Sequence, residues 1–204
     1  MTEWNGPDKM KMDIIRNTVK LFHVYGVKSL LVSDIAQLSG MSVRALNSYF
    51  TNKESLLKSC VEYKISQEEI FKYADDGLLD VLVNYAETYP KFLQRINRRC
   101  CTDIKKYYPS VYIFLCDYLE RYTTVCRNKV ETEIMNGYIR KNTSPVLVYD
   151  FLNECFSHLF EARIVFRENE RLMMTERILV FTRGIVTVKG KVYMEKKLKI
   201  KNIK

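Results

Sequence analysis

The residues whose types and spacing could do chemistry lie together in the stretch 42–50. On a helical wheel, one side of this stretch is apolar, and the opposite side carries a valine, a cation, an amide and a hydroxyl: Val43, Arg44, Asn47 and Ser48. Guanidinium, amide and hydroxyl groups bind base edges and phosphates in the major groove of DNA. This face is therefore a candidate DNA-reading surface, and the alternative is a helical hairpin with a solvated polar face.

Patterns for catalysis and metal binding are missing from the sequence. The chain has two histidines, His23 and His158, and its six cysteines include no C-x-x-C pair. It has no paired acid and base, no glycine-rich phosphate loop and no nucleophile elbow. We therefore expect no enzyme activity, no bound metal and no cofactor.

Two adjacent cysteines suggest a redox role. Cys100 and Cys101 directly follow Arg98 and Arg99. Neighbouring cations lower the pKa of a thiol, so one hypothesis is that this pair senses oxidants. The alternative is that all six cysteines are reduced and mostly buried, as is usual in a chain of this length without an export signal.

The elements that position the reading face are expected to be helices. The chain has 204 residues, of which 7 are glycine and 4 are proline, and this shortage of helix breakers argues against an all-β protein.

Its net charge of +9 suits a nucleic-acid partner, and the excess lies mostly in residues 91–106 and 189–204. No apolar run approaches the roughly 20 residues of a membrane span, and the first residues lack the apolar segment of a signal peptide. We expect an all-α protein in the cytoplasm with no membrane partner.

Apolar spacing and end signals predict where the helices lie. The expected ranges are 9–25, 32–39, 43–50, 53–73, 78–96, 109–137, 145–166 and 175–188. Thr51 and Glu54 have the spacing of a capping box at the start of the fourth range. Residues 97–106 are expected to form a polar, basic stretch. The lysine-rich residues 189–204 are expected to be a solvated end, with sequence-blind attraction to DNA as the alternative.

Residues 31–50 have the spacing of a helix-turn-helix. Two helices joined by a tight turn need a small residue where they cross and a backbone that turns sharply. Ala36 and Gly40 meet these two needs, and Ser42 is placed to cap the second helix.

The run around this motif, residues 14–61, resembles the N-terminal domain of the TetR family of bacterial transcriptional regulators. The matching features occur in the family's order and spacing: Leu21-Phe22, Tyr25-Gly26, Asp34-Ile35-Ala36, Gly40-Met41-Ser42, Tyr49-Phe50, Lys53-Glu54 and Leu56-Leu57. The rest of the chain is similar to the family in its helical pattern alone. The resemblance implies about nine helices, a homodimer formed by the last two, and an effector pocket in the larger domain.

The resemblance also implies which residues touch DNA. The recognition segment would comprise Ser42, Val43, Arg44, Ala45, Asn47, Ser48 and Tyr49, with Lys53 as a phosphate contact. A lysine at a helix N-terminus independently favours an anion. Arg44, Ala45 and Asn47 stand where the family usually has glycine, threonine or serine, and tyrosine. These departures make Arg44 the best candidate for a base contact, to O6 and N7 of guanine.

The predicted helices at 145–166 and 175–188 carry more apolar surface than one domain needs. The first has two apolar stripes, although one stripe is enough to bury a helix against its own domain, and the second is apolar over most of its length. We expect a second copy to cover this surface in a four-helix bundle. The alternative is a fully buried helix pair in a monomer.

Aromatic residues are dense beyond residue 70, and most of them are expected to form the core. A minority could line an apolar pocket whose tyrosine hydroxyls orient a ligand. The candidate lining residues are Tyr85, Phe92, Tyr112, Cys116, Tyr122, Phe156 and His158.

Taken together, these features predict a DNA-binding domain at residues 1–52 and an effector-binding and dimerisation domain at residues 53–204. We expect a sequence-specific transcriptional regulator, most simply a repressor that a small apolar or aromatic effector releases from a palindromic, double-stranded operator. One alternative is a non-specific, architectural DNA-binding protein without an effector. Another is a regulator that activates instead of repressing.

Overall fold

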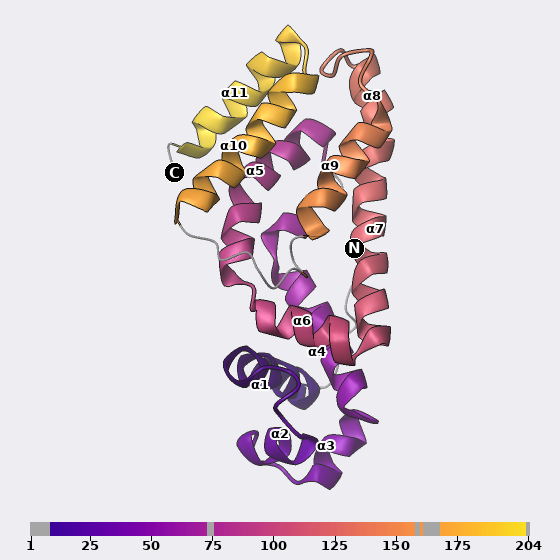
Figure 1. Cartoon of the computed structure of the whole chain (residues 1–204), viewed down its shortest axis with the longest axis vertical. Helices are drawn as coiled ribbons and strands as arrows, with labels where there is room; N and C mark the ends of the chain where they lie inside the picture. The colour runs from indigo at the N-terminus through magenta and orange to yellow at the C-terminus, as the bar shows by residue number, and fades with distance from the viewer. Residues whose placement is uncertain (1–8, 73–75, 158–159, 161–167, 203–204) are drawn as a thin grey trace. The chain divides into compact units, whose positions relative to one another are not determined.

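The computed structural model of this chain is built from α-helices. It describes residues 9–72, 76–157, 160 and 168–202. No strand occurs in these ranges, where a single antiparallel bridge joins Ile139 and Val186. The helices are labelled α1 to α11 in Figure 1, so the predicted all-α fold is confirmed, with slightly more helices than the nine expected.

The helices form two compact units. The first unit combines Met1–Gln67 with Asn97–Leu115, and the second combines Glu68–Ile96 with Cys116–Lys204. These units are defined by packing alone. The functional boundary that we expect after residue 52 therefore stays a prediction.

The first unit contains the predicted helix-turn-helix. Its helices are α1 (Lys9–Tyr25), α2 (Val32–Leu38), α3 (Val43–Tyr49), α4 (Lys53–Gln67), α6 (Arg98–Tyr107) and the start of α7 (Pro109–Asn128). One core joins them, and its members include Ile15, Phe22, Ile35, Leu46, Leu57 and Ile104. The turns need residues that adopt positive φ, and glycine fills this role at Gly26 (φ 82°) and Gly40 (φ 68°).

Helix α4 of this unit is capped differently from the prediction, and α2 begins without a capping side chain. The backbone N–H of Ser55 donates to Oδ1 of Asn52 at 2.8 Å, so α4 is capped by Asn52 and not by a box of Thr51 and Glu54. Leu31 precedes α2 without a capping side chain, and its backbone N–H instead donates to Oδ2 of Asp34 at 2.7 Å.

Helix α6 was not predicted. Its sequence is mostly polar and basic, and only Cys101 and Ile104 are buried, so an apolar period is hard to find. The side chain of Asn97 caps it, because Oδ1 accepts a hydrogen bond from the backbone N–H of Cys100 at 3.2 Å.

The second unit is organised around α5 (Leu78–Arg95), which continues through Pro90. The other elements are η1 (Glu69–Phe71), the rest of α7, α8 (Val130–Met135), α9 (Pro145–Ser157), α10 (Glu168–Ile185) and α11 (Val188–Asn202). Helices α10 and α11 both pack against α5 (Figure 1). The single helix expected over 109–137 is broken between α7 and α8, and the fourth helix ends at Gln67, earlier than expected.

The lysine-rich end was predicted wrongly as a solvated tail. It forms the helix α11, whose Met194 is fully buried. The first turn of α5 binds it through one carboxylate, because Asp80 accepts a hydrogen bond from the Tyr193 hydroxyl at 2.9 Å and pairs with Lys197 at 2.8 Å. The prediction failed because lysines dominate the sequence and obscure the few side chains that pack inward.

Candidate nucleic-acid interface

Helix α3 presents the face that the sequence predicted. Leu46 and Phe50 are buried and Tyr49 is half-buried, so these residues fix the helix to the core of the first unit. The opposite face is exposed and consists of Val43, Arg44, Asn47 and Ser48. The predicted inward and outward sides of this helix are therefore confirmed.

The two serines of α3 are engaged with its own backbone. Oγ of Ser42 accepts a hydrogen bond from the backbone N–H of Ala45 at 3.1 Å, and Oγ of Ser48 donates to the carbonyl of Ala45 at 2.7 Å. Among the described residues, neither Arg44 nor Asn47 has a hydrogen bond or ion pair through its side chain. The guanidinium and the amide are thus the groups on this face that are available to bind bases.

The remaining predicted DNA contacts have mixed surroundings. Ala45 is half-buried and offers no polar side-chain group. Nζ of Lys53 donates to the carbonyl of Val27 at 2.6 Å and lies 5.4 Å from the ring centre of Tyr108. Its ammonium has two further N–H groups, so the phosphate contact of Lys53 stays a prediction.

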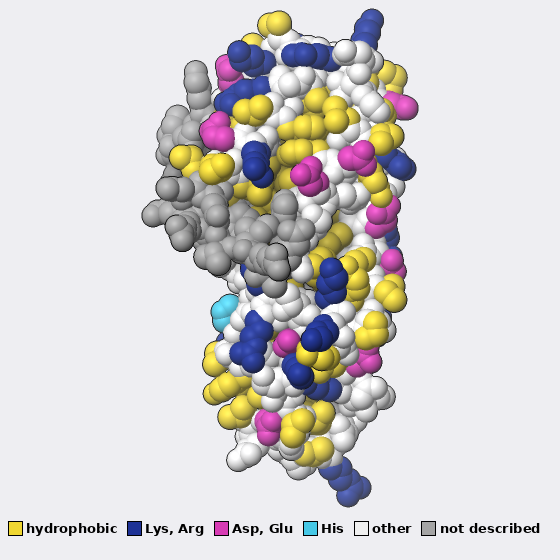
Figure 2. All heavy atoms as spheres, viewed as in Figure 1, with side chains coloured by type: hydrophobic (Ala, Val, Ile, Leu, Met, Phe, Trp, Pro, Cys, Tyr) yellow, Lys and Arg dark blue, Asp and Glu magenta, His cyan; other side chains and the backbone are white. Residues whose placement is uncertain are grey.

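Positive charge alone does not define a DNA surface here. On the face shown in Figure 2, the described Lys and Arg side chains are scattered among hydrophobic ones and do not gather into a single basic stripe. On this face, the distribution of charge therefore does not by itself mark a DNA-binding surface.

Helix α6 holds the end of α1 and the turn after it. Nδ2 of Asn97 donates to the carbonyl of His23 at 2.6 Å, and the backbone N–H of Lys28 donates to Oδ2 of Asp103 at 2.9 Å. The Arg99 guanidinium donates to Oγ of Ser29 at 3.1 Å. These bonds fix the chain just before α2, and they therefore help to position the helix-turn-helix.

The cysteines of α6 do not have the environment of redox sensors. The thiol of Cys100 donates to the carbonyl of Phe22 at 3.0 Å, and burial raises its pKa to about 11. Burial also raises the pKa of Cys101 to about 12. The prediction that adjacent arginines lower these pKa values is wrong, because desolvation outweighs the neighbouring cations.

The predicted effector residues are only partly brought together. Four of them meet in the core of the second unit with other aromatic rings: Tyr85, Phe92, Tyr122 and Phe156. Tyr112 packs instead on the core of the first unit, Cys116 is half-buried in the second, and His158 lies outside the described residues.

The rings of the aromatic cluster are in contact with one another. Tyr85 stacks on Tyr89 with ring centres 4.7 Å apart, and the Tyr122 hydroxyl donates to the carbonyl of Ile70 at 3.0 Å. The Tyr89 hydroxyl donates to the carbonyl of Cys155. The fully buried Tyr85 hydroxyl has no well-formed hydrogen bond among the described residues, and the Cys155 thiol lies beside it.

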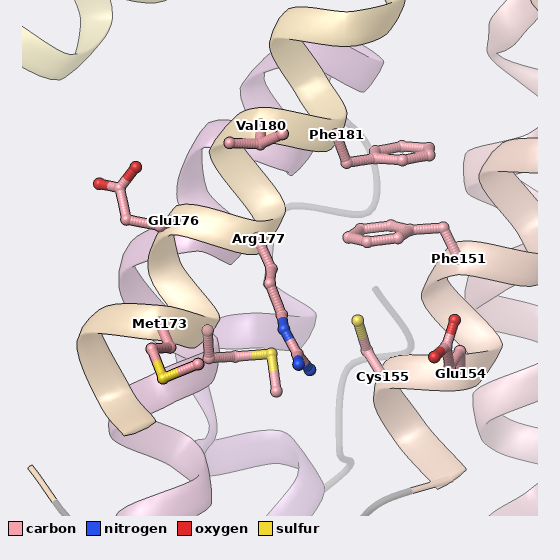
Figure 3. Close-up of a pocket in the computed structure, with 9 residues that line it drawn as sticks. Phe151, Glu154, Cys155, Met173, Glu176, Arg177, Val180 and Phe181 are labelled. Atoms are coloured by element: carbon pink, nitrogen blue, oxygen red, sulfur yellow. The ribbon is translucent and has the colours of Figure 1, made fainter. Parts of the chain in front are cut away.

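An open groove of about 620 Å³ lies between α9 and α10, and sequence reasoning missed it. Two of its lining residues, Phe151 and Phe181, stack on each other in direct contact with ring centres 3.8 Å apart, and Arg177 extends from α10 toward α9 (Figure 3). Its remaining walls are apolar or acidic: Glu154, Cys155, Met173, Met174, Glu176 and Val180. No sequence signal marks this groove, because its residues come from two separate helices and form no motif.

Apolar side chains on α9 and α10 also reach the surface of this unit. Val146 and Leu147 on α9 and Met173 and Val180 on α10 are each about half exposed or more. Val148, Leu152 and Ile178 are fully buried, so one side of each helix already satisfies its own core. These side chains are thus exposed apolar groups on the two helices.

In the described ranges, no three His, Cys, Asp or Glu side chains come close enough together to hold a metal ion. None of the described helices is long and apolar enough to cross a membrane.

Comparisons with known proteins agree with this geometry. Residues 14–60 match the family model described as "Bacterial regulatory proteins, tetR family". No curated protein matches the sequence.

Several solved structures share the fold along nearly their whole length. GusR of Salmonella enterica is 18% identical, with a TM-score of 0.67 over 90% of this chain and 98% of its own. A TetR transcriptional regulator of Chloroflexus aurantiacus is 15% identical, with a TM-score of 0.71 over 87% and 96%. The ketosteroid transcriptional regulator KstR2 of Mycobacterium tuberculosis is 14% identical, with a TM-score of 0.59 over 89% and 97%. The predicted resemblance is therefore confirmed: residues 14–60 carry the sequence pattern of the tetR family of bacterial regulatory proteins, and the chain has the fold of TetR-family transcriptional regulators.

Proposed function

We propose that this protein is a sequence-specific DNA-binding transcriptional regulator that acts in the cytoplasm. The observation that supports this most strongly is the outward face of α3, where the side chains of Arg44 and Asn47 are exposed on a helix fixed by buried Leu46. Such a helix fits the major groove, where arginine binds guanine and asparagine binds adenine. The recognition segment runs from Ser42 to Tyr49, and Lys53 is a phosphate contact at the start of α4.

The protein acts as a homodimer in this proposal. The exposed apolar side chains of α9 and α10 support a four-helix interface with a second copy. The groove between these helices carries both charge signs, from Glu154 and Arg177, which suits a two-fold interface in which the same surface meets itself. Two recognition helices would then read half-sites about 34 Å apart, or a multiple of that, on a pseudo-palindromic operator.

A small apolar or aromatic effector would release the operator. The support is the aromatic core of the second unit around Phe156, where the buried Tyr85 hydroxyl is available to a polar atom of a ligand. Linkage then requires DNA to weaken effector binding by the same factor, typically 5–150-fold.

The experiment that tests DNA reading is the variant Arg44→Ala. We expect it to weaken binding to the operator, selected from random DNA with the wild-type protein, by about 10-fold or more, and to weaken binding to shuffled DNA much less. Lys20→Ala is the matched control, because it removes one exposed cation of the first unit outside α3. It should reduce binding to both DNAs by similar factors. Equal losses for Arg44→Ala would mean that Arg44 contacts only phosphate or nothing. A wild-type protein that binds operator and shuffled DNA equally well would favour the alternative, a non-specific architectural DNA-binding protein.

The dimer is tested separately by sedimentation. Leu147→Glu combined with Val180→Glu puts two charges into the proposed interface and should give a monomer. Val192→Glu on α11 changes an apolar side chain that is equally exposed (63%) but lies outside that interface, and it should leave the dimer intact. A dimer that survives both charges would place the interface elsewhere.

A further inference from the structure

The reading face of α3 contains one apolar side chain. Val43 is the first residue of this helix and is 40% exposed. It precedes Arg44 directly and lies one turn before Asn47, so it shares the face with both polar residues. Because valine is branched at Cβ, it has one strongly preferred rotamer in a helix, and its methyl groups therefore hold a fixed position.

The chemistry of the major groove gives this side chain a specific target. The edges of guanine, cytosine and adenine present donors and acceptors there, whereas thymine adds an apolar 5-methyl group. Contact between that methyl and a valine methyl removes apolar surface from water, and neither cytosine nor uracil can supply it. An apolar residue on the same face as a guanidinium and an amide thus adds a type of discrimination that the two polar groups lack.

The serines strengthen this assignment. Ser42 and Ser48 are bonded to the backbone of Ala45, so they are less available to bases than their positions suggest. The groups that remain on the face are one apolar, one cationic and one amide side chain: Val43, Arg44 and Asn47.

We propose that Val43 selects thymine in each half of the operator through contact with the 5-methyl group. This inference rests on the proposed function, in which α3 lies in the major groove. One residue advances a helix by 1.5 Å and one base step advances DNA by about 3.4 Å, so adjacent side chains reach the same or neighbouring base pairs. The selected thymine lies within about two base pairs of the guanine that Arg44 binds.

The test replaces each thymine of the selected operator, one at a time, with deoxyuridine, which changes only the methyl group. At one position in each half-site, wild-type affinity should fall about fourfold, the equivalent of about 0.8 kcal/mol for a buried methyl group, and about fifteenfold when both half-sites are changed. Val43→Ala should bind the thymine and uracil operators equally. Val43→Thr keeps the branched Cβ and one methyl, so it should still prefer thymine.

Leu38→Ala is the matched control, because Leu38 is a similarly exposed apolar residue of the same unit outside α3 (54%). It should keep the full thymine preference. The inference is overturned if wild-type protein binds the operator specifically but ignores every thymine methyl. It is also overturned if Val43→Ala, with a normal helical spectrum and melting temperature, retains the preference. If the wild-type protein binds operator and shuffled DNA equally well, the proposed function itself is refuted instead.

Discussion

Two glycines in consecutive helices respond oppositely to the same substitution. Gly184 lies in α10, and a Cβ atom added there has no neighbour within 4 Å. Gly190 lies in the first turn of α11, and a Cβ atom added there would be 2.1 Å from the carbonyl oxygen of Tyr138. Alanine favours a helix over glycine by up to about 1 kcal/mol, so Gly184→Ala should stabilise the protein by about that amount.

At Gly190 the overlap is with backbone, so α11 must move. The hydrogen bonds that hold its start include Thr187 N–H to the carbonyl of Tyr138 (3.0 Å), Oγ1 of Thr187 to the carbonyl of Gly137 (2.7 Å) and Gly190 N–H to Oγ1 of Thr187 (3.1 Å). Each contributes about 1 kcal/mol, so their loss costs about 3 kcal/mol. After the gain in helix propensity, Gly190→Ala should destabilise the protein by about 2 kcal/mol.

Thermal unfolding followed by circular dichroism measures both effects at one protein concentration, because oligomerisation makes the melting temperature concentration-dependent. For a chain of this size, 1 kcal/mol shifts Tm by about 2–4 °C. We expect Gly184→Ala to raise Tm by about 2–4 °C, and Gly190→Ala to lower it by about 4–8 °C. Equal shifts for the two variants would show that α11 does not pack closely against the turn at Gly137 and Tyr138.

Three further predictions follow from the buried groups. Cys100 and Cys101 should remain thiols in mild peroxide at neutral pH, because their pKa values are raised to about 11 and 12; a sulfenic acid or a disulfide in the mass spectrum would contradict this. Phe156→Ala should destabilise the protein by about 3–5 kcal/mol in urea unfolding, since its ring packs among several others, and a loss below about 1 kcal/mol would mean that the cluster is loosely packed. Burial raises the pKa of Glu133 above its ordinary 4.5, so the stability of the wild type relative to Glu133→Gln should fall as the pH rises from about 4.5 through that raised pKa; a Tm difference independent of pH would refute the raised pKa.

Much of the first unit could be predicted from the sequence because its signals are local. Leu46 is buried and Arg44 is exposed, as their spacing on a helix predicts. Gly26 and Gly40 both adopt the positive φ that their turns need. The inward and outward sides of α3 follow from this spacing alone.

The second unit was less predictable because its arrangement depends on contacts between distant residues. Lys197 of α11 pairs with Asp80 at the start of α5, and neither residue carries a local signal for this contact. The groove between α9 and α10 has the same origin. Tyr112 was assigned to the ligand site from its aromatic character, yet α7 passes from one unit to the other and places this residue in the first.

The central claim is that α3 reads a DNA sequence, and the ratio of specific to non-specific affinity tests it most directly. The full-length protein would be titrated at one fixed salt concentration with the DNA upstream of its own gene and with a shuffled version of the same DNA. A sequence-specific regulator should bind the first about 10³-fold or more tightly than the second. A ratio near one, at a salt concentration where both complexes form, would contradict the claim.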